Sequence, residues 1–99
     1  IYPSMISIGN NVTIGSNTMI FAHYNPTANQ LLKENGYPRK VKKVTINDGA
    51  VIGPGSIITM GTTIGKNSII GAGSVVSNTI PDFSIALGNP ARVIKKINL

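Results

Sequence analysis

The chain has 99 residues, enough for one small domain with a modest core that often depends on partners or cross-links. It has no cysteine, which excludes disulfides and thiolate metal sites. Hydrophobic residues make up 41% and charged residues only 12%, so Asn, Ser, Thr and Gly must supply most of the polar surface. The formal charge of +6 favours an anionic partner, such as nucleic acid, a phosphate-bearing cofactor or an acidic membrane.

The sequence contains no signal for membrane insertion or export. No run approaches the roughly 18 apolar residues of a membrane span, and the first residues lack the basic-then-apolar profile of a signal peptide. We therefore expect a soluble, cytoplasmic protein.

An aliphatic residue returns every six positions through most of the chain. This period is neither the 3.6 of a helix nor the alternation of a long strand, and it indicates short β segments joined by regular turns. The chain starts at Ile1 rather than Met, and Tyr2 stands where an aliphatic residue is due, so we expect further coils upstream. The aliphatic series is Ile8, Ile14 and Ile20, followed by Ile46, Ile52, Ile58, Ile64, Ile70 and Val76.

The third position after each aliphatic residue predicts the turns. Gly and Asn dominate it, and both tolerate a left-handed backbone. The two exceptions, His23 and Thr79, stand where the repeat is about to break off. The full column is Asn11, Asn17, His23, Gly49, Gly55, Gly61, Asn67, Gly73 and Thr79.

Residues 24–44 lose the six-residue phase, because the step from Ile20 to Ile46 is not a multiple of six. They contain Pro26, Gly36 and Pro38 and five basic residues, so we expect a long, basic, protruding loop, and such loops are often functional. The basic residues are Lys33, Arg39, Lys40, Lys42 and Lys43.

After Pro81 the pattern changes again. Residues 82–87 predict a strand, residues 88–90 a turn, and the basic, apolar tail 91–99 a strand or a short helix. We therefore divide the chain into a repeat region, 1–81, which carries the inserted loop 24–44, and a C-terminal strand and tail, 82–99. Stacked coils expose edges and apolar surface at both ends, which predicts a homo-oligomer.

The chain resembles the hexapeptide-repeat acyltransferases, in the branch of the maltose, galactoside and polysaccharide O-acetyltransferases and the xenobiotic acetyltransferases. The resemblance rests on the hexads, the loop that opens at His23, the block 70–81 and the ending 88–95. It implies an all-β, left-handed parallel β-helix with three hexads per coil, assembled as a homotrimer. That hand runs against the usual right-handed crossover.

The resemblance also implies a reaction, the transfer of an acyl group, expected to be acetyl, from acyl-CoA to a hydroxyl or amine of a sugar-like acceptor. His23 matches the loop histidine that acts as general base, and an imidazole is available in its neutral form near neutral pH. Since no cysteine can form an acyl-enzyme, direct transfer is the simpler mechanism, and no metal is expected. The residues that match CoA-contacting positions are Ala72, Ser77, Asn78, Arg92 and Lys95, and Tyr24 and Asn25 are candidates for the acceptor site.

Two positions depart from the family pattern. Asn78 replaces a common lysine, and Pro54 occupies a corner whose backbone amide often points toward the thioester. Proline has no N–H, so stabilisation of the oxyanion must come from elsewhere, with Gly55 as one candidate, or be absent. Because Pro54 and Ala72 stand at the same step of their hexads, we expect them to stack on one corner.

Other interpretations remain open at this level. His23 can simply fill a turn, and Arg92 and Lys95 can belong to a solvated basic tail. A non-catalytic structural trimer explains the hexads equally well. A nucleic-acid-binding module fits the charge, but the aromatic residues are not interleaved with the basic ones, and we predict no nucleic-acid or membrane partner. A β-helical carbonic anhydrase needs three histidines, and this chain has one.

Overall fold

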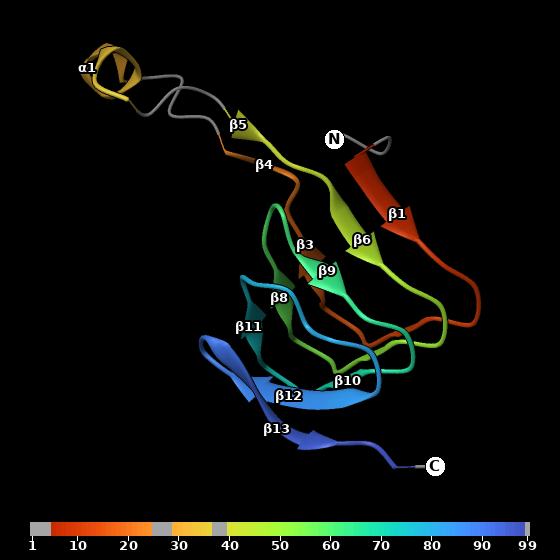
Figure 1. Cartoon of the computed structure of the whole chain (residues 1–99). Helices are drawn as coiled ribbons and strands as arrows, with labels where there is room; N and C mark the ends of the chain where they lie inside the picture. Colours follow the sequence, from red (N-terminus) through yellow and green to blue (C-terminus); the bar gives the residue numbers. More distant parts are fainter. Residues whose placement is uncertain (1–4, 25–28, 37–39, 99) are drawn as a thin grey trace.

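The computed structural model describes residues 5–24, 29–36 and 40–98. The chain winds into a column of triangular coils whose three sides are short strands (Figure 1). The first coils contain β1 (Ile6–Ile8), β2 (Thr13–Ile14), β3 (Met19–Ile20), β6 (Val44–Ile46), β7 (Val51–Ile52) and β8 (Ile57–Ile58). The later coils contain β9 (Thr63–Ile64), β10 (Ile69–Ile70), β11 (Val75–Val76), β12 (Ser84–Gly88) and β13 (Ala91–Lys96).

Parallel pairing between successive coils builds three faces. The first face consists of β1, β6 and β9, the second of β2, β7, β10 and β12 with β13 at its edge, and the third of β3, β8 and β11. Val51 pairs with Ile69 and Ile57 with Val75, so one coil takes 18 residues, or three hexads. The fold is the all-β, left-handed parallel β-helix that the family resemblance implies.

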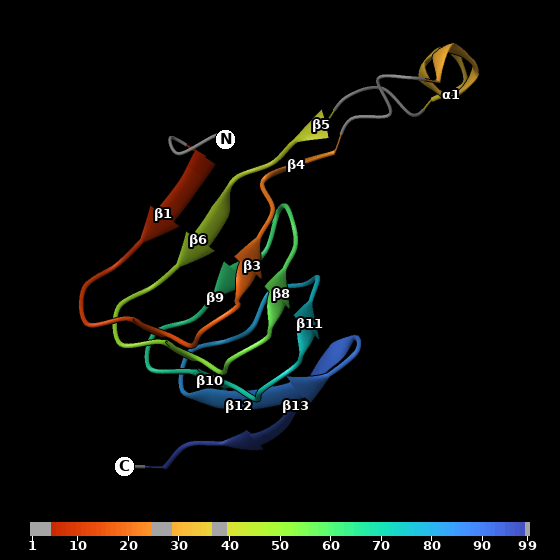
Figure 2. The ribbon, with the colours of Figure 1, turned by 180° about the vertical axis from the view of Figure 1, so that it is seen from behind.

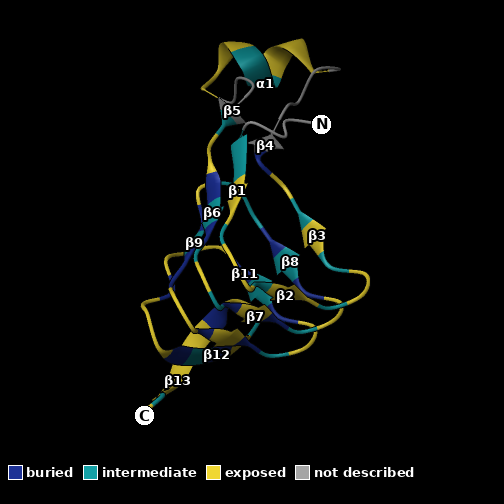
Figure 3. Ribbon diagram, turned by 90° about the vertical axis from the view of Figure 1, so that its right-hand side faces the viewer, coloured by how far each residue is buried: buried dark blue, intermediate teal, exposed yellow. Residues whose placement is uncertain are grey.

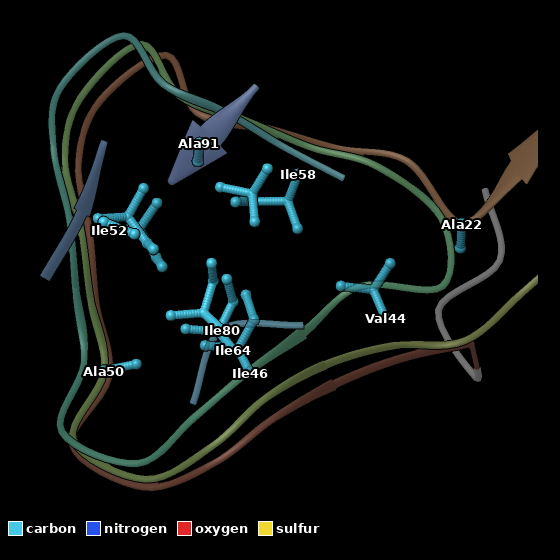
Figure 4. Close-up of a cluster of buried hydrophobic side chains, with 12 residues drawn as sticks. Ala22, Val44, Ile46, Ala50, Ile52, Ile58, Ile64, Ile80 and Ala91 are labelled. Atoms are coloured by element: carbon cyan, nitrogen blue, oxygen red, sulfur yellow. The ribbon is translucent and has the colours of Figure 1, made fainter. Parts of the chain in front are cut away.

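The aliphatic repeat forms the core. Ile46, Ile52, Ile58, Ile64 and Ile70 are all at most 1% exposed. Figure 4 shows Ile46, Ile52 and Ile58, one from each face, pointing toward the axis of the coil. The small residues of the repeat are buried beside them, and their hydroxyl groups donate to backbone carbonyls, as Ser68 Oγ does to Pro81 O at 2.6 Å. The buried hydroxyls are thus satisfied without breaking the close approach of the coils.

The predicted turn column is confirmed. Seven of its residues have a positive φ, and they are Asn11, Asn17, Gly49, Gly55, Gly61, Asn67 and Gly73. Phe83 also has a positive φ, of 53°, which its residue type did not predict. It takes the place of Asn67 one coil later, where its N–H donates to Lys66 O at 2.8 Å.

The first coil differs from the others in its exposure. Its inward isoleucines Ile8 and Ile14 are 47% and 39% exposed, whereas their partners Ile46 and Ile52 in the next coil are 1% exposed. Figure 3 shows β1 without buried residues, whereas its neighbour β6 contains them, in dark blue. The end formed by the first coil therefore presents apolar surface.

The insertion interrupts the coil between the third and first faces. Ile20 pairs with Ile58, an offset of 38 positions where a plain coil has 18. The neck of the insertion is an antiparallel pair, β4 (His23–Tyr24) and β5 (Lys40–Val41). Beyond it lies α1 (Gln30–Glu34), which projects away from the column in both Figure 1 and Figure 2. The sequence did not predict this helix, whose N-cap Asn29 accepts a hydrogen bond from the Leu32 N–H at 3.0 Å.

The C-terminal tail is a strand, not a short helix. β13 pairs antiparallel with β12 and so closes the second face at the far end of the column. Lys96 fastens it, because Nζ donates to Asp82 O and to Ser84 Oγ, each at 3.2 Å. No helix in the described ranges is long and apolar enough to cross a membrane.

Adjacent residues of β10 provide a matched test of the core. Replacing Ile70, which is 1% exposed, with alanine is expected to lower the free energy of unfolding by about 2–5 kcal/mol, because a cavity remains at the axis. Ile69→Ala is the control, since Ile69 is 37% exposed and faces outward. Urea unfolding at one protein concentration measures both, and equal losses would contradict the inward assignment.

Candidate functional site

The corner between the third and first faces, which we call the loop corner, is where the insertion leaves the column. Ala22, which is buried, is the last residue before the exit, and its carbonyl accepts the Lys42 N–H at 2.9 Å. His23 pairs through its backbone with Val41 in the neck, immediately outside this closure. The structure therefore places Val41 opposite His23 and Lys42 opposite Ala22, although these residues are far apart in sequence.

The two acceptor-site candidates lie further out. Tyr24 pairs through its backbone with Lys40 in the neck, and Asn25 lies outside the described residues. Of the two, only Tyr24 can therefore be placed, at the start of the insertion beside the loop corner.

Ser77 and Asn78 lie on the same corner, further along the column. Both are exposed and follow directly after β11. Ile58 pairs with Val76, but Ile64 pairs with Ile80, so the last turn of this corner is two residues shorter than the one before it. His23 and Asn78 are two coil steps apart, which is about 10 Å at ordinary β spacing.

The corner between the second and third faces, which we call the proline corner, carries Pro54 and Ala72. Gly73 N–H donates to Pro54 O at 2.9 Å, so these residues stack on one corner, as predicted. Gly55 N–H donates to Ser16 O, also at 2.9 Å. The proline corner thus lacks one N–H at Pro54, and the Gly55 N–H that could replace it is already bonded to the preceding coil.

Arg92 and Lys95 lie on β13, and both are exposed. Arg92 pairs with Leu87, and Lys95 with Ile85, on the outer side of the second face. Leu87 in turn packs against Gly71, since a Cβ at Gly71 would lie 2.8 Å from Leu87 Cβ. Arg92 therefore belongs to the same end of the second face as Ala72.

Within one chain, the predicted cofactor residues form two groups. Ser77 and Asn78 share the loop corner with His23, whereas Ala72, Arg92 and Lys95 lie at the proline corner and the second face. Ala72 and Ser77 stand before and after β11, five positions apart, which spans up to about 16 Å of extended chain. A single chain therefore does not gather all of these residues around one point.

The sequence did not single out Lys42, which it placed only among the basic residues of the loop. In the structure its aliphatic stem lies against Gly61, because a Cβ at Gly61 would be 3.3 Å from Lys42 Cδ and 3.6 Å from Lys42 Cβ. Gly61 stands one coil step further along the loop corner, since Thr45 pairs with Thr63. Two sequence features could have pointed to this contact, namely Gly61 in the turn column and Lys42 near the end of the predicted loop.

Family models and a solved structure similar to this chain identify its family. Residues 43–78 match the bacterial transferase hexapeptide model, and residues 5–22 match the hexapeptide repeat of succinyl-transferase. A galactoside acetyltransferase solved in complex with coenzyme A superposes with a TM-score of 0.83 and 40% identity over 94% of this chain and 46% of its own. The chain belongs to the hexapeptide-repeat acyltransferases. The similarity includes both corners, because it extends over nearly the whole chain.

Two further relatives are an O-acetyltransferase and an N-acyltransferase. The galactoside O-acetyltransferase of Lactococcus lactis is 42% identical over 93 residues, covering 94% of this chain and 44% of the relative. A mutant of AntD, an N-acyltransferase from Bacillus cereus in complex with dTDP and coenzyme A, has a TM-score of 0.80 and 28% identity, covering 94% of this chain and 53% of AntD. The chain spans less than half the length of the curated galactoside relative.

The tight stacking at the proline corner can be tested with two glycines. A Cβ at Gly53 would lie 2.5 Å from Ala72 N and 2.8 Å from Ala72 Cα, so Gly53→Ala is expected to displace backbone and lower the thermal midpoint clearly. Gly73→Ala is the control, because Gly73 has open space around it and only its φ of 69° opposes a side chain. A smaller loss for Gly53→Ala than for Gly73→Ala would contradict the close approach.

Proposed function

We propose that this protein transfers an acetyl group from acetyl-CoA to a hydroxyl or amine of a sugar-like small acceptor, with His23 as general base. The observation that carries the proposal is the break in the coil beside His23, in a fold that matches a CoA-bound galactoside acetyltransferase at a TM-score of 0.83. Relatives that act on galactosides, and AntD with its bound dTDP, support a sugar-like acceptor.

The proposed chemistry is a direct transfer. His23 takes the proton of the acceptor O–H or N–H while that atom attacks the thioester carbonyl carbon. The tetrahedral intermediate then collapses, the C–S bond breaks, and the imidazolium returns its proton to the departing thiolate. The products are free CoA and an acetylated acceptor, and no residue of the protein is acylated.

The two separated groups of site residues support an active site between subunits of a homotrimer. In this arrangement the loop corner of one copy, with His23, Ser77 and Asn78, faces the proline corner of a neighbour, with Ala72 and Arg92. Third-face side chains on the outside of the column are apolar, as with Met19, which is 51% exposed. Burial of this surface against a second copy would stabilise the assembly.

The basic residues of β13 suit the charged end of CoA. Arg92 and Lys95 are exposed on a strand that Lys96 fastens to the column, so their charges are held on a fixed element. Cations at such positions form charge-assisted hydrogen bonds with phosphate oxygens. Acetyl-CoA as the acyl donor also fits the expected cytoplasmic location, which stays a prediction.

The base assignment predicts a specific loss in one variant. His23→Ala is expected to reduce the turnover of acetyl-CoA, measured as thiol release with a panel of sugars and amines, by at least about 10²-fold, because the proton acceptor is gone. Binding of CoA, measured by calorimetry, is expected to stay close to wild type. Full activity in His23→Ala would refute the role of His23.

The same measurements distinguish acyl transfer from the two alternative functions, a structural trimer and a nucleic-acid-binding module. Binding of acetyl-CoA by the wild type, without turnover on any acceptor, would favour a non-catalytic structural trimer. Tight, salt-sensitive binding of oligonucleotides without binding of CoA would favour a nucleic-acid-binding module.

If Arg92 and Lys95 bind the phosphates of CoA, their removal should weaken only the binding of ligands that contain phosphate. The double variant Arg92→Ala and Lys95→Ala is expected to raise the Kd for CoA about tenfold or more, while the Kd for acetyl-pantetheine, which lacks the phosphates, stays unchanged. Lys66→Ala is the matched control, since Lys66 is exposed on the corner between the first and second faces. Equal weakening for both ligands would show that the tail acts only through packing.

A further inference from the structure

We propose that Asn35 is a site of spontaneous deamidation, in which its side-chain amide is lost by reaction with the Gly36 nitrogen at a rate that α1 controls. Asn35–Gly36 is the one place in the chain where asparagine directly precedes glycine. Asparagine is a chemically labile residue type, and glycine after it has no Cβ to hinder the approach of its nitrogen. The site is in the insertion and does not depend on the proposed acyl transfer.

Asn35 and Gly36 lie in open surroundings at the end of α1. Both residues are exposed. Apart from its chain neighbours, no described residue comes within 4 Å of the point where a Gly36 Cβ would be. The φ of Gly36 is 94°, in a region that glycine enters without strain. The described surroundings therefore do not obstruct a rearrangement of this pair.

The helix holds the Asn35 side chain as long as it stays formed. Asn35 Nδ2 donates to Leu31 O at 2.7 Å, and the Asn35 N–H donates to Leu32 O at 3.1 Å. The Asn35 backbone has φ −110° and ψ 31°. Attack of the Gly36 nitrogen on the side-chain carbon requires a rotation about ψ, which these two bonds oppose. The reactive conformation is therefore reached only when α1 opens.

Opening of α1 does not require the column to unfold. The helix has five residues and none of them is buried, and isolated helices shorter than roughly 12 residues are marginal in water. Its described side-chain bonds are the Asn29 cap on the Leu32 N–H and the bond from Gln30 Nε2 to Glu34 Oε1, each 3.0 Å long. Elements with so few buried contacts open far more often than the whole protein does.

A turn of the column with similar chemistry is protected. Asp48 precedes Gly49, and an aspartate before glycine can undergo the same ring closure. In the structure Asp48 Oδ1 accepts the Asn10 N–H at 2.7 Å, and the Gly49 N–H donates to Asn10 O at 2.9 Å. Both the side chain and the attacking nitrogen are thus bonded to the preceding coil, so this pair reacts only if coils separate.

The reaction needs only water. The Gly36 nitrogen loses its proton and attacks Asn35 Cγ, the Cγ–Nδ2 bond breaks, and Nδ2 leaves as ammonia. Water then opens the resulting succinimide at either carbonyl, which gives aspartate or isoaspartate. Neither carboxylate can donate to Leu31 O, and each adds a negative charge beside Glu34 at the C-terminal end of α1, where the helix dipole disfavours it. The modified protein therefore has a weaker α1.

Incubation of the folded protein at mildly alkaline pH tests the site. Trypsin releases residues 34–39 as one peptide, in which mass spectrometry follows the conversion of amide to acid and chromatography separates aspartate from isoaspartate. Asn35 is expected to convert at least about tenfold faster than Asn67, which precedes a serine and whose N–H donates to Asp48 O at 3.0 Å. Slower conversion of Asn35 than of Asn67 would refute the site.

Two substitutions at the N-cap test the control by α1. Asn29→Ala removes the capping oxygen and is expected to raise the rate at Asn35 about fivefold, because the helix opens more often. Asn29→Ser is the matched control, since serine also caps helices, and it is expected to stay within about twofold of wild type. Equal rates in the two variants would refute the control by α1.

Gly36→Ala tests the attacking atom. A methyl group beside the nitrogen is expected to slow the reaction at least about tenfold, even if the φ of Gly36 must change to accept it. If Gly36→Ala reacts as fast as wild type, the Gly36 nitrogen is not the nucleophile and the proposal is wrong. These variants lie in the insertion, so their thermal midpoints should equal that of wild type.

Discussion

The structure depends on the stacking of one coil on the next at β-strand spacing. Strands on the three faces pair with those of the neighbouring coil, so the strands of each coil must stay in register with those of the next. Where a side chain would keep the coils apart, the chain has glycine, as at Gly53 beneath Ala72. The register of 18 residues per coil, the buried isoleucine columns and the hydroxyl-to-carbonyl bonds all follow from this one constraint.

That constraint also determines where function can be placed. A regular coil offers short strands and tight turns, with little room for a reactive side chain, so departures from regularity matter. There are two departures at the loop corner, the insertion after Ala22 and the last turn, which is two residues short. They put His23, Lys42, Ser77 and Asn78 at one corner of the column, whereas the proline corner keeps the regular turn.

The loss of one N–H at Pro54 illustrates how such a column can accommodate change. Replacing a corner residue with proline leaves the coil register intact, because the carbonyl of Pro54 still accepts from Gly73. Only the N–H of this position is lost.

The sequence by itself determined the class of fold and most of its details. A six-residue aliphatic period indicates short β segments joined by regular turns, and Gly or Asn at a fixed offset locates those turns, as the positive φ values of Asn11 and Gly55 confirm. His23 could be singled out because it broke this pattern. It stays a prediction as the base, as do the CoA-contacting residues.

Only the tertiary structure decided which residues of the insertion and the tail meet the column. α1 and the strand at residues 91–96 depend on Asn29 as a cap and on pairing with β12, which composition does not specify. The engaged Gly55 N–H and the contact of Lys42 with Gly61 join residues that are distant in sequence, so no spacing rule predicts them. The physical reason is that repeats encode stacking locally, whereas the chemistry of a corner depends on which chain segments return to it.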